Sequence, residues 1–220
     1  MMLTLDLWPT LSLVVVILSW FVFAAVFLIF GDKTKSPPDK TRAPGSLVGV
    51  VLQGMGYGLA WGIQRARFSP IVPVGVSGKI ILFAVILALA IASPLFAFRA
   101  RQTLGKQWSV TARLVEGHRL VTQGPYRIVR NPIYTGMFGM LLATGLAISH
   151  WIGLAIAIIV FAIGTMIRVR NEERLLRAAF GAEFDDYARR VDTVSFLRDH
   201  FEKSQDTCHP GSGHSRESGD

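Results

Sequence analysis

The feature that most constrains the fold is the stretch from Pro132 to Ile167, in which only His150 can carry a charge near neutral pH. As one helix it would be about 54 Å long, whereas a hydrocarbon core is about 30 Å thick. The chain must therefore fold back on itself, and the sequence Ser149-His150-Trp151 marks the break. Small residues predict close contact between the two arms, namely Gly139, Ala143 and Ala147 on the first and Gly153 and Ala157 on the second.

Three further apolar segments precede this hairpin. Residues 11–30 contain no charge, residues 46–63 are apolar and glycine-rich, and residues 80–98 lie between Lys79 and Arg99. In the second segment, glycines at four-residue spacing predict close approach by a neighbouring helix and would also allow two copies of the chain to associate as a homo-oligomer: Gly54, Gly58 and Gly62. The sequence thus predicts an all-α, polytopic integral membrane protein with five transmembrane helices, a C-terminal helical hairpin and cytoplasmic amphipathic helices.

Composition agrees with this fold class and excludes several functions. The chain is 51% hydrophobic and 17% charged, a lower charged fraction than soluble domains carry. The net charge of +8 comes from Lys and Arg between the apolar blocks, which indicates loops facing anionic lipid and no nucleic acid. The single cysteine, Cys208, excludes an intramolecular disulfide, and the five histidines lack metal-binding spacing, so no metal site is expected.

Charge also predicts the orientation. The loop at 31–45, the region 99–130 and the region after Arg168 are rich in Lys and Arg and are placed in the cytoplasm. Five spans then put the N-terminus outside, and the linker with Arg65, Arg67 and Lys79 falls on the outer side, in mild conflict with the rule. We divide the chain into N-terminal helices (1–98), a core (99–202) and a disordered tail (203–220).

Two stretches flank the hairpin and meet at one membrane face, residues 118–136 and 168–191. The first contains Gly124-Pro125 and Asn131-Pro132, which favour irregular backbone with free N–H and C=O groups. Such backbone is tolerated at a membrane only where it is buried in protein or faces a polar cavity. The structural alternative is a plain interfacial connector, with tyrosines in the aromatic belt and arginines as anchors.

In the second stretch, Glu172 and Glu173 follow directly on a span that ends in Arg168 and Arg170. A glutamate near membrane depth needs a cation or hydroxyl partner. Consecutive helical residues point about 100° apart, so we expect Glu172 to face a pocket and Glu173 to pair with Arg177 in solvent. The alternative is an amphipathic interfacial helix whose apolar face holds Leu175, Leu176, Ala179 and Phe180.

The order of motifs is more specific than either stretch. H-x-L-V-T-x-G-P-Y-x-x-x-R-N-P-x-Y-x-G, an apolar hairpin, R-x-x-x-E-E and F-G-x-E-F-x-x-Y together resemble the isoprenylcysteine carboxyl methyltransferase family, which is grouped with the phospholipid methyltransferases. The resemblance covers about residues 108–191. It implies an integral-membrane enzyme that uses S-adenosylmethionine, and the distribution of Lys and Arg predicts that its site lies on the cytoplasmic face.

The resemblance also implies roles for individual residues. The cofactor-binding positions fall on His118, Arg119, Leu120, Val121, Tyr126, Asn131, Pro132, Ile133, Tyr134 and Glu172. Asn131 departs from the family's histidine. Arg168 corresponds to the arginine at the methyl acceptor and is the candidate catalytic residue.

Elementary chemistry is compatible with these roles, because a sulfonium and an ammonium favour a pocket with an acid, aromatic walls and free backbone groups. The acceptor stays open between a prenylcysteine-like carboxylate, a phospholipid amine and a small thiol or acid, and no dedicated base is evident. Two alternatives also stay open. One is a membrane reductase related to the sterol reductases, which use a nicotinamide cofactor, and the other is a non-catalytic membrane scaffold.

Overall fold

The computed structural model describes residues 7–28, 39–42, 45–65, 71, 74–105, 113–115 and 119–193. In 39–42 and 113–115 only the backbone is described. The predicted tail at 203–220 and the side chains of His118 and Cys208 lie outside these residues.

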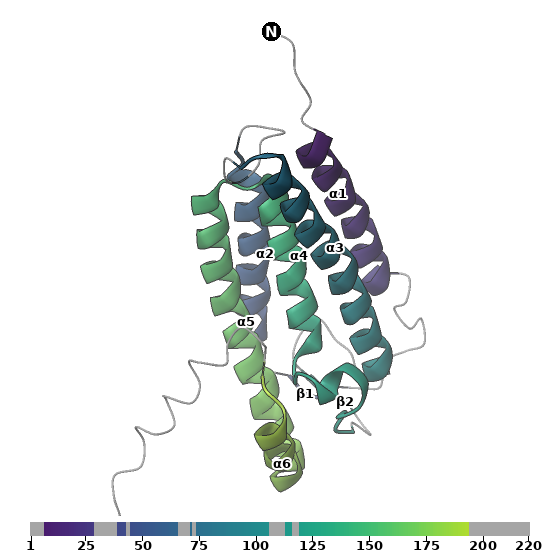
Figure 1. Cartoon of the computed structure of the whole chain (residues 1–220). Helices are drawn as coiled ribbons and strands as arrows, with labels where there is room; N and C mark the ends of the chain where they lie inside the picture. Colours follow the sequence, from purple (N-terminus) through teal and green to yellow (C-terminus); the bar gives the residue numbers. More distant parts are fainter. Residues whose placement is uncertain are drawn as a thin grey trace, which may run out of the picture.

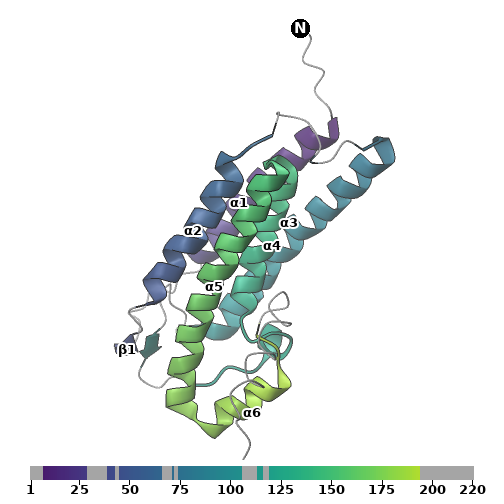
Figure 2. The same ribbon diagram turned by 90° about the vertical axis from the view of Figure 1, so that its left-hand side faces the viewer.

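Five helices run side by side as one bundle (Figure 1, Figure 2). They are α1 (Leu7–Leu28), α2 (Ser46–Gly62), α3 (Val76–Leu104), α4 (Pro132–Ile148) and α5 (Trp151–Phe180). The predicted break at Ser149 and His150 is confirmed, since α4 ends at Ile148 and α5 begins at Trp151. A short 3₁₀ helix, η2 (Gly124–Arg127), precedes α4, and α6 (Ala182–Arg190) follows α5.

The predicted membrane architecture is confirmed in its main lines. By length and composition, α1, α3 and α5 are able to cross a bilayer, while α4 is apolar but has only 17 residues. Helix α2 also has 17 residues, which gives a length of about 26 Å. The fold is an all-α polytopic membrane bundle.

The amphipathic region is organised differently from the prediction. Helix α5 runs unbroken through Arg168 to Phe180, and a turn at Gly181 separates it from α6. Ala179, predicted on the apolar face, is exposed, whereas Phe184 and Tyr187 of α6 are buried. The apolar face that covers the end of the bundle therefore belongs to α6.

Two short segments in the connectors between helices, which the sequence predicts as loops, form a pair of β-strands. Backbone hydrogen bonds join β1 (Asp39–Arg42) and β2 (Arg113–Val115) in an antiparallel pair, with Asp39 opposite Val115 and Arg42 opposite Arg113. The pair ties the connector between α1 and α2 to the connector between α3 and α4, at the end of the bundle that holds α6 (Figure 1).

The glycine face of α2 is not the predicted one. Gly54, Gly58 and Gly62 have no heavy atom within 4 Å of the position that a Cβ would take. The contact with α5 is made by the opposite side of α2, where Gly49 and Gly56 meet α5 side chains and backbone. Both faces carry glycine, and the buried Gln53 lies on the second. Association of two copies through the first face stays a prediction.

The two arms of the hairpin pack mainly against other helices, which also differs from the prediction. Gly139 faces Ser93 of α3, and Gly153 faces Ile63 beyond α2. Ala143 and Ala147 pack with Val16 of α1 and Ile86 of α3, and Ala157 packs with Ala60. Close contact between the arms is made by Gly145 and Leu154, where an added Cβ would lie 2.2 Å from Leu154 Cδ1.

Polar groups inside the bundle are paired across helices, as a membrane interior requires. Pro94 in α3 has no N–H, so the carbonyl of Ala90 loses its helical donor. The Ser19 hydroxyl of α1 donates to that carbonyl. Trp20 Nε1 likewise donates to Thr144 Oγ1 over 3.0 Å. These bonds fix α1 against α3 and α4.

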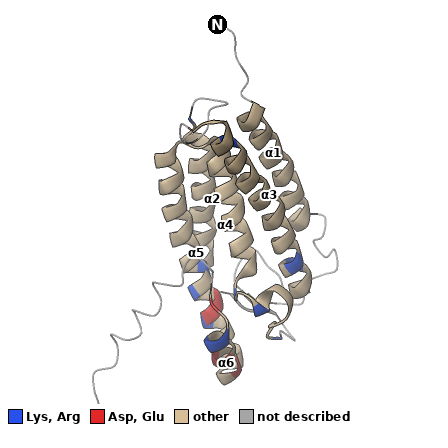
Figure 3. Ribbon diagram, viewed as in Figure 1, with Lys and Arg blue, Asp and Glu red and all other residues tan. Residues whose placement is uncertain are grey.

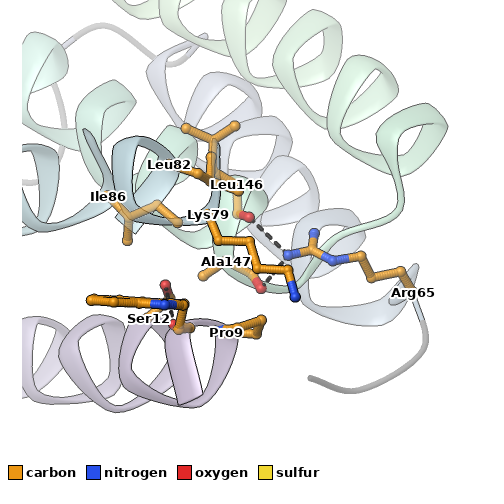
Figure 4. Close-up of a pocket in the computed structure, with 9 residues that line it drawn as sticks. Pro9, Ser12, Arg65, Lys79, Leu82, Ile86, Leu146 and Ala147 are labelled. Carbon is orange, nitrogen blue, oxygen red and sulfur yellow. Dashed lines mark hydrogen bonds between the residues drawn. The ribbon is translucent and has the colours of Figure 1, made fainter. Parts of the chain in front are cut away.

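Arg65 explains the positive charge at the end predicted to face outward. Its guanidinium donates to the carbonyl oxygens of Leu146, Ala147 and Ser149 over 2.9, 2.6 and 2.7 Å. Figure 4 shows the side chain reaching the first two of these oxygens from across a small cavity that Lys79 also lines. The last carbonyls of a helix lack internal donors and favour a cation. Arg65 therefore closes the C-terminus of α4.

Charged side chains are concentrated at the opposite end, around the last turns of α5 and α6 (Figure 3). Here η2, the N-terminus of α4 and the end of α5 come together. The antiparallel course of α4 and α5 brings both motif stretches to this end, as the hairpin predicts.

The two glycine faces of α2 give a matched stability test. A Cβ at Gly49 would lie 2.4 Å from Arg168 Cγ and 2.7 Å from the Gly164 carbonyl oxygen. Gly49→Ala should therefore destabilise the protein by about 1–3 kcal/mol, whereas Gly54→Ala should leave stability unchanged or slightly raised. Thermal unfolding in detergent micelles measures both. Equal melting temperatures for the two variants would contradict the packing described for α2 and α5.

Candidate functional site

The centre of the site is a buried charged cluster formed by Arg168, Tyr134 and Glu172. Arg168 Nε donates to the Tyr134 hydroxyl over 2.9 Å, and its guanidinium carbon lies 4.9 Å from the centre of the Tyr134 ring. The Tyr134 hydroxyl donates to Glu172 Oε1, and Arg168 Nη2 lies 3.7 Å from the same oxygen. Positions 168 and 172 are one helical turn apart, so α5 presents both to Tyr134 in the first turn of α4.

Arg168 points into the bundle. Only 7% of the residue is exposed, and its guanidinium contacts side chains from α2, α4 and α5. An arginine that served as a membrane anchor would extend toward lipid phosphates. The observed placement instead makes Arg168 part of an internal polar cluster.

Glu172 is half-buried, with 28% of its side chain exposed. Its contacts with Tyr134 and Arg168 both use Oε1. These contacts thus hold the carboxylate through Oε1.

Helix α2 contributes a residue to the site that was not predicted from the sequence. Gln53, 2% exposed, accepts a hydrogen bond from Arg168 Nη1 over 3.3 Å and donates to Thr165 Oγ1 over 2.9 Å. Gln53 is flanked by apolar residues and matches no motif, so only its polarity inside an apolar segment could have singled it out.

The loop before α4, which contains Gly124-Pro125 and ends at Asn131, is hydrogen-bonded to α6. Tyr126, in η2, is buried, and its carbonyl accepts a 2.7 Å hydrogen bond from the Tyr187 hydroxyl. Burial raises the pKa of Tyr126 well above its usual range; the charges of Glu172 and Tyr187 act in the same direction and Arg101 opposes them. Burial likewise raises the pKa of Tyr187 to about 12, with Arg130 lowering it and Glu173 raising it. Both hydroxyls therefore stay protonated at neutral pH.

Glu173 takes part in a second buried cluster, and its predicted pairing with Arg177 is wrong. Glu173 Oε1 lies 3.2 Å from Arg130 Nε, and Arg177 instead pairs with Asp185 of α6 at 2.8 Å. The interpretation of Glu173 as solvent-facing fails because α6 folds back and the loop before α4 covers that side of α5.

Arg130 and Asn131 fasten the loop to the chain after α6. Arg130 donates to the Ala188 carbonyl over 2.9 Å and to the Thr193 hydroxyl. The backbone N–H and side-chain amide of Asn131 donate to the Thr193 carbonyl over 3.1 and 3.2 Å. In this structure the Asn131 amide thus holds the residues that follow α6.

The remaining predicted cofactor residues divide into buried and accessible positions. Pro132 is buried at the first position of α4, Ile133, Leu120 and Val121 are half-buried, and Arg119 is exposed. Leu120 and Val121 lie outside helices and strands, so regular structure does not use their backbone groups. His118 lies outside the described residues. Residues Tyr126, Tyr134 and Glu172 are brought to one region, and Arg168 joins them.

The buried Arg130 and Glu173 pair should matter for stability. Glu173→Leu removes the carboxylate and leaves the guanidinium of Arg130 in a site where it is 12% exposed, so we expect a loss of about 2–3 kcal/mol. Asp185→Leu is the control, because its pair with Arg177 is exposed and should contribute less than about 1 kcal/mol. Melting temperatures in detergent compare the two. A larger loss for Asp185→Leu would contradict the assignment.

No group of three or more His, Cys, Asp or Glu side chains within metal-binding reach occurs in the described part of the chain. Comparison with known proteins shows what this part of the chain is similar to. Residues 81–183 match the family model described as phospholipid methyltransferase. This segment contains Tyr126, Tyr134, Arg168 and Glu172.

Individual relatives match over two-fifths of the chain. The nickel-cobalt-cadmium resistance protein NccN of Alcaligenes xylosoxydans xylosoxydans is 36% identical over 92 residues, which are 40% of this chain and 42% of that protein. Protein-S-isoprenylcysteine O-methyltransferase B of Arabidopsis thaliana is 33% identical over 92 residues, 40% of this chain and 46% of that protein. A probable protein-S-isoprenylcysteine O-methyltransferase of Oryza sativa subsp. japonica is 29% identical over 91 residues, 40% of this chain and 48% of its own length.

The match thus spans less than half the length of each of these curated relatives. Identity is modest, but the matched segment contains both motif stretches and the hairpin between them. Residues 81–183 are therefore similar to the phospholipid methyltransferases, and the Arabidopsis and Oryza relatives that match the chain are named as isoprenylcysteine methyltransferases.

Proposed function

We propose that the chain is an integral-membrane methyltransferase that transfers a methyl group from S-adenosylmethionine to a lipophilic acceptor. The observation that carries the proposal is the cluster of Arg168, Tyr134 and Glu172, which lies inside the family-matched segment at the charged end of an apolar bundle. An ionisable cluster at this depth is costly and must be paired, and such clusters mark candidate functional sites in membrane proteins.

The residues fit S-adenosylmethionine by their chemistry. Glu172 Oε2 would bind a cationic or hydroxyl group of the cofactor, and the rings of Tyr126 and Tyr134 would provide aromatic walls. Leu120 and Val121, which lie outside helices and strands, would offer backbone groups. When bound, the cofactor supplies a methyl group on a positively charged sulfur, and an acceptor lone pair takes the methyl carbon as the carbon–sulfur bond breaks.

Arg168 is assigned to the acceptor. Its guanidinium lies between Glu172 and Gln53, so it faces the cofactor residues on one side and α2 on the other. A guanidinium holds a carboxylate or a polar head group by paired hydrogen bonds in a fixed plane. Held in this way, an acceptor would meet the methyl group in a defined direction with water excluded, which is where most of the acceleration of such a reaction originates.

The acceptor class is a lipophilic or membrane-associated molecule. The names of the Arabidopsis and Oryza relatives refer to prenylated cysteine, and an acceptor with an apolar tail suits a site reached from the bilayer. A charged cluster at this depth is costly, which favours a functional site over a non-catalytic scaffold.

A labelled-methyl transfer assay tests the proposal directly. Membranes containing the protein are supplied with tritium-labelled S-adenosylmethionine and, in parallel, with N-acetyl-S-farnesylcysteine, phosphatidylethanolamine and dodecanethiol. Membranes from cells without the protein are the control. Incorporation into one acceptor supports the proposal and identifies its class, whereas no incorporation above control contradicts it.

Substitutions of Arg168 and Glu172 should affect different steps, methyl transfer for Arg168 and cofactor binding for Glu172. Arg168→Lys keeps a charge but loses the planar fork, so methyl transfer should fall by about tenfold or more, equivalent to about 1.4 kcal/mol or more, while cofactor affinity stays near that of the parent. Glu172→Gln should instead weaken cofactor binding. Calorimetric titration and transfer rates at saturating cofactor measure the two effects, and the exposed Glu183→Gln is the control. Unchanged transfer in Arg168→Lys would contradict its role at the acceptor.

We place the site on the cytoplasmic side, because the end with η2 and α6 contains most of the Lys and Arg. Single cysteines replacing the exposed Ile128 and Val76, at opposite ends of the bundle, test this in a Cys208→Ser background. In intact cells an impermeant thiol reagent should label position 76 and not position 128. The reverse result would invert the orientation and exclude access to cytoplasmic cofactor.

A further inference from the structure

We propose that Gln53 of α2 is a positioning residue that holds the Arg168 guanidinium in the orientation needed to bind the acceptor. The inference rests on the proposed role of Arg168 and extends it to a helix outside the family-matched segment, which begins at residue 81. Gln53 would act through Arg168 and would not itself touch the reacting groups.

The contacts of Gln53 are directional. Its Oε1 accepts from Arg168 Nη1, and its Nε2 donates to Thr165 Oγ1. A reversed amide would place an NH₂ group against a guanidinium, and two donors would then face each other. The Arg168 guanidinium, which can only donate, therefore fixes the amide with Oε1 toward Nη1, and the Thr165 hydroxyl accepts from Nε2 on the other side.

The side chain is also too costly to be incidental. Gln53 is 2% exposed in an apolar helix, and a buried amide is unfavourable unless its polar atoms are hydrogen-bonded. A leucine of similar size would pack at this position without such a requirement. The amide is thus better explained by its partner than by packing.

The space around Arg168 is shaped to match. One turn before Gln53, Gly49 leaves room for the aliphatic part of Arg168, since a Cβ there would lie 2.4 Å from Arg168 Cγ. Gly164 lets α2 approach, because its missing Cβ would lie 2.9 Å from the Gln53 backbone nitrogen. The two glycines leave room for the aliphatic part of the Arg168 side chain and for the approach of α2, and the Gln53 amide binds one terminal nitrogen of the arginine.

The three nitrogens of Arg168 face three different partners. Nε contacts Tyr134 and Nη2 approaches Glu172, both on the side assigned to the cofactor, whereas Nη1 contacts Gln53. Loss of Gln53 would let the guanidinium rotate about its pairing with Glu172. The plane offered to the acceptor would then change while the cofactor residues keep their places.

Chemical modification of arginine tests whether Gln53 holds Arg168, and it does not depend on methyl transfer. Purified parent and Gln53→Leu protein are treated with phenylglyoxal, and mass spectrometry follows the peptides containing Arg168 and Arg130. Arg168 should react at least about threefold faster in Gln53→Leu, because its side chain is no longer held against α2. Arg130 should react at the parental rate. Unchanged reactivity of Arg168, or an equal rise at Arg130, would overturn the proposal.

Kinetics then test the consequence for the acceptor that the parent methylates. For Gln53→Leu we expect kcat/KM for that acceptor to fall by about tenfold, with the KM for cofactor within about twofold of the parent. Gln53→Glu keeps an oxygen for Nη1 and should recover most of the activity. In an Arg168→Lys background, Gln53→Leu should cause no further loss, since a residue acting through Arg168 has no independent effect.

The matched control is Gln64→Leu, the same change at an exposed glutamine. The side-chain amide of Gln64 donates to the carbonyl of Trp61, three residues earlier. It should leave every rate at the parental value. A further loss in the double variant, or a failure of Gln53→Glu to recover activity, would overturn the positioning role. If the parent methylates none of the acceptors offered, the proposed function fails, whereas the modification rates still decide the role of Gln53.

Discussion

The cost of keeping charge inside an apolar bundle determines how this molecule is arranged at its charged end. Arg168 and Glu172 lie one turn apart on α5 and are close enough to pair, but each also needs hydrogen-bond partners from other helices. Tyr134 bridges the two from α4, and Gln53 completes the contacts of Arg168 from α2. Three helices are thus held in register by the same guanidinium, so the site and the packing of the bundle depend on each other.

The same requirement explains features far from the site. Where Pro94 interrupts the hydrogen bonds of α3, a serine of α1 supplies the missing donor. Where α4 ends, Arg65 supplies donors for its last carbonyls, and its charge at that end follows from local need. At the other end, the Tyr187 hydroxyl donates to the Tyr126 carbonyl of the loop before α4, while Arg130 and Asn131 of that loop donate to the carbonyls of Ala188 and Thr193. In each of these places a polar side chain supplies a hydrogen bond that irregular or terminal backbone lacks.

The sequence was informative where a local property decided the outcome. The uncharged run that is too long for one span predicted the break before Trp151, and the motif order predicted that Tyr134, Arg168 and Glu172 belong together. It failed where two local solutions were equivalent. Both faces of α2 carry glycines, and the face that packs is the one on which Gly49 meets Arg168 and Gly56 meets Phe161 of α5. Glu173 had a suitable cation one turn away, yet it pairs with Arg130, because the loop and α6 fold over that side of α5.

The residues around Arg168 come from two parts of the chain. Tyr134, Arg168 and Glu172 lie within residues 81–183, the segment that matches a family model, whereas Gly49 and Gln53 lie before it. A substitution in α2 would change the hold on one nitrogen of Arg168 while leaving the contacts of Tyr134 with Glu172 in place. A requirement shared by methyltransferases, binding the same cofactor, would constrain the matched segment. A requirement that differs between them, orienting a particular acceptor, is met more easily from α2, since that helix reaches Arg168 from the side away from Glu172.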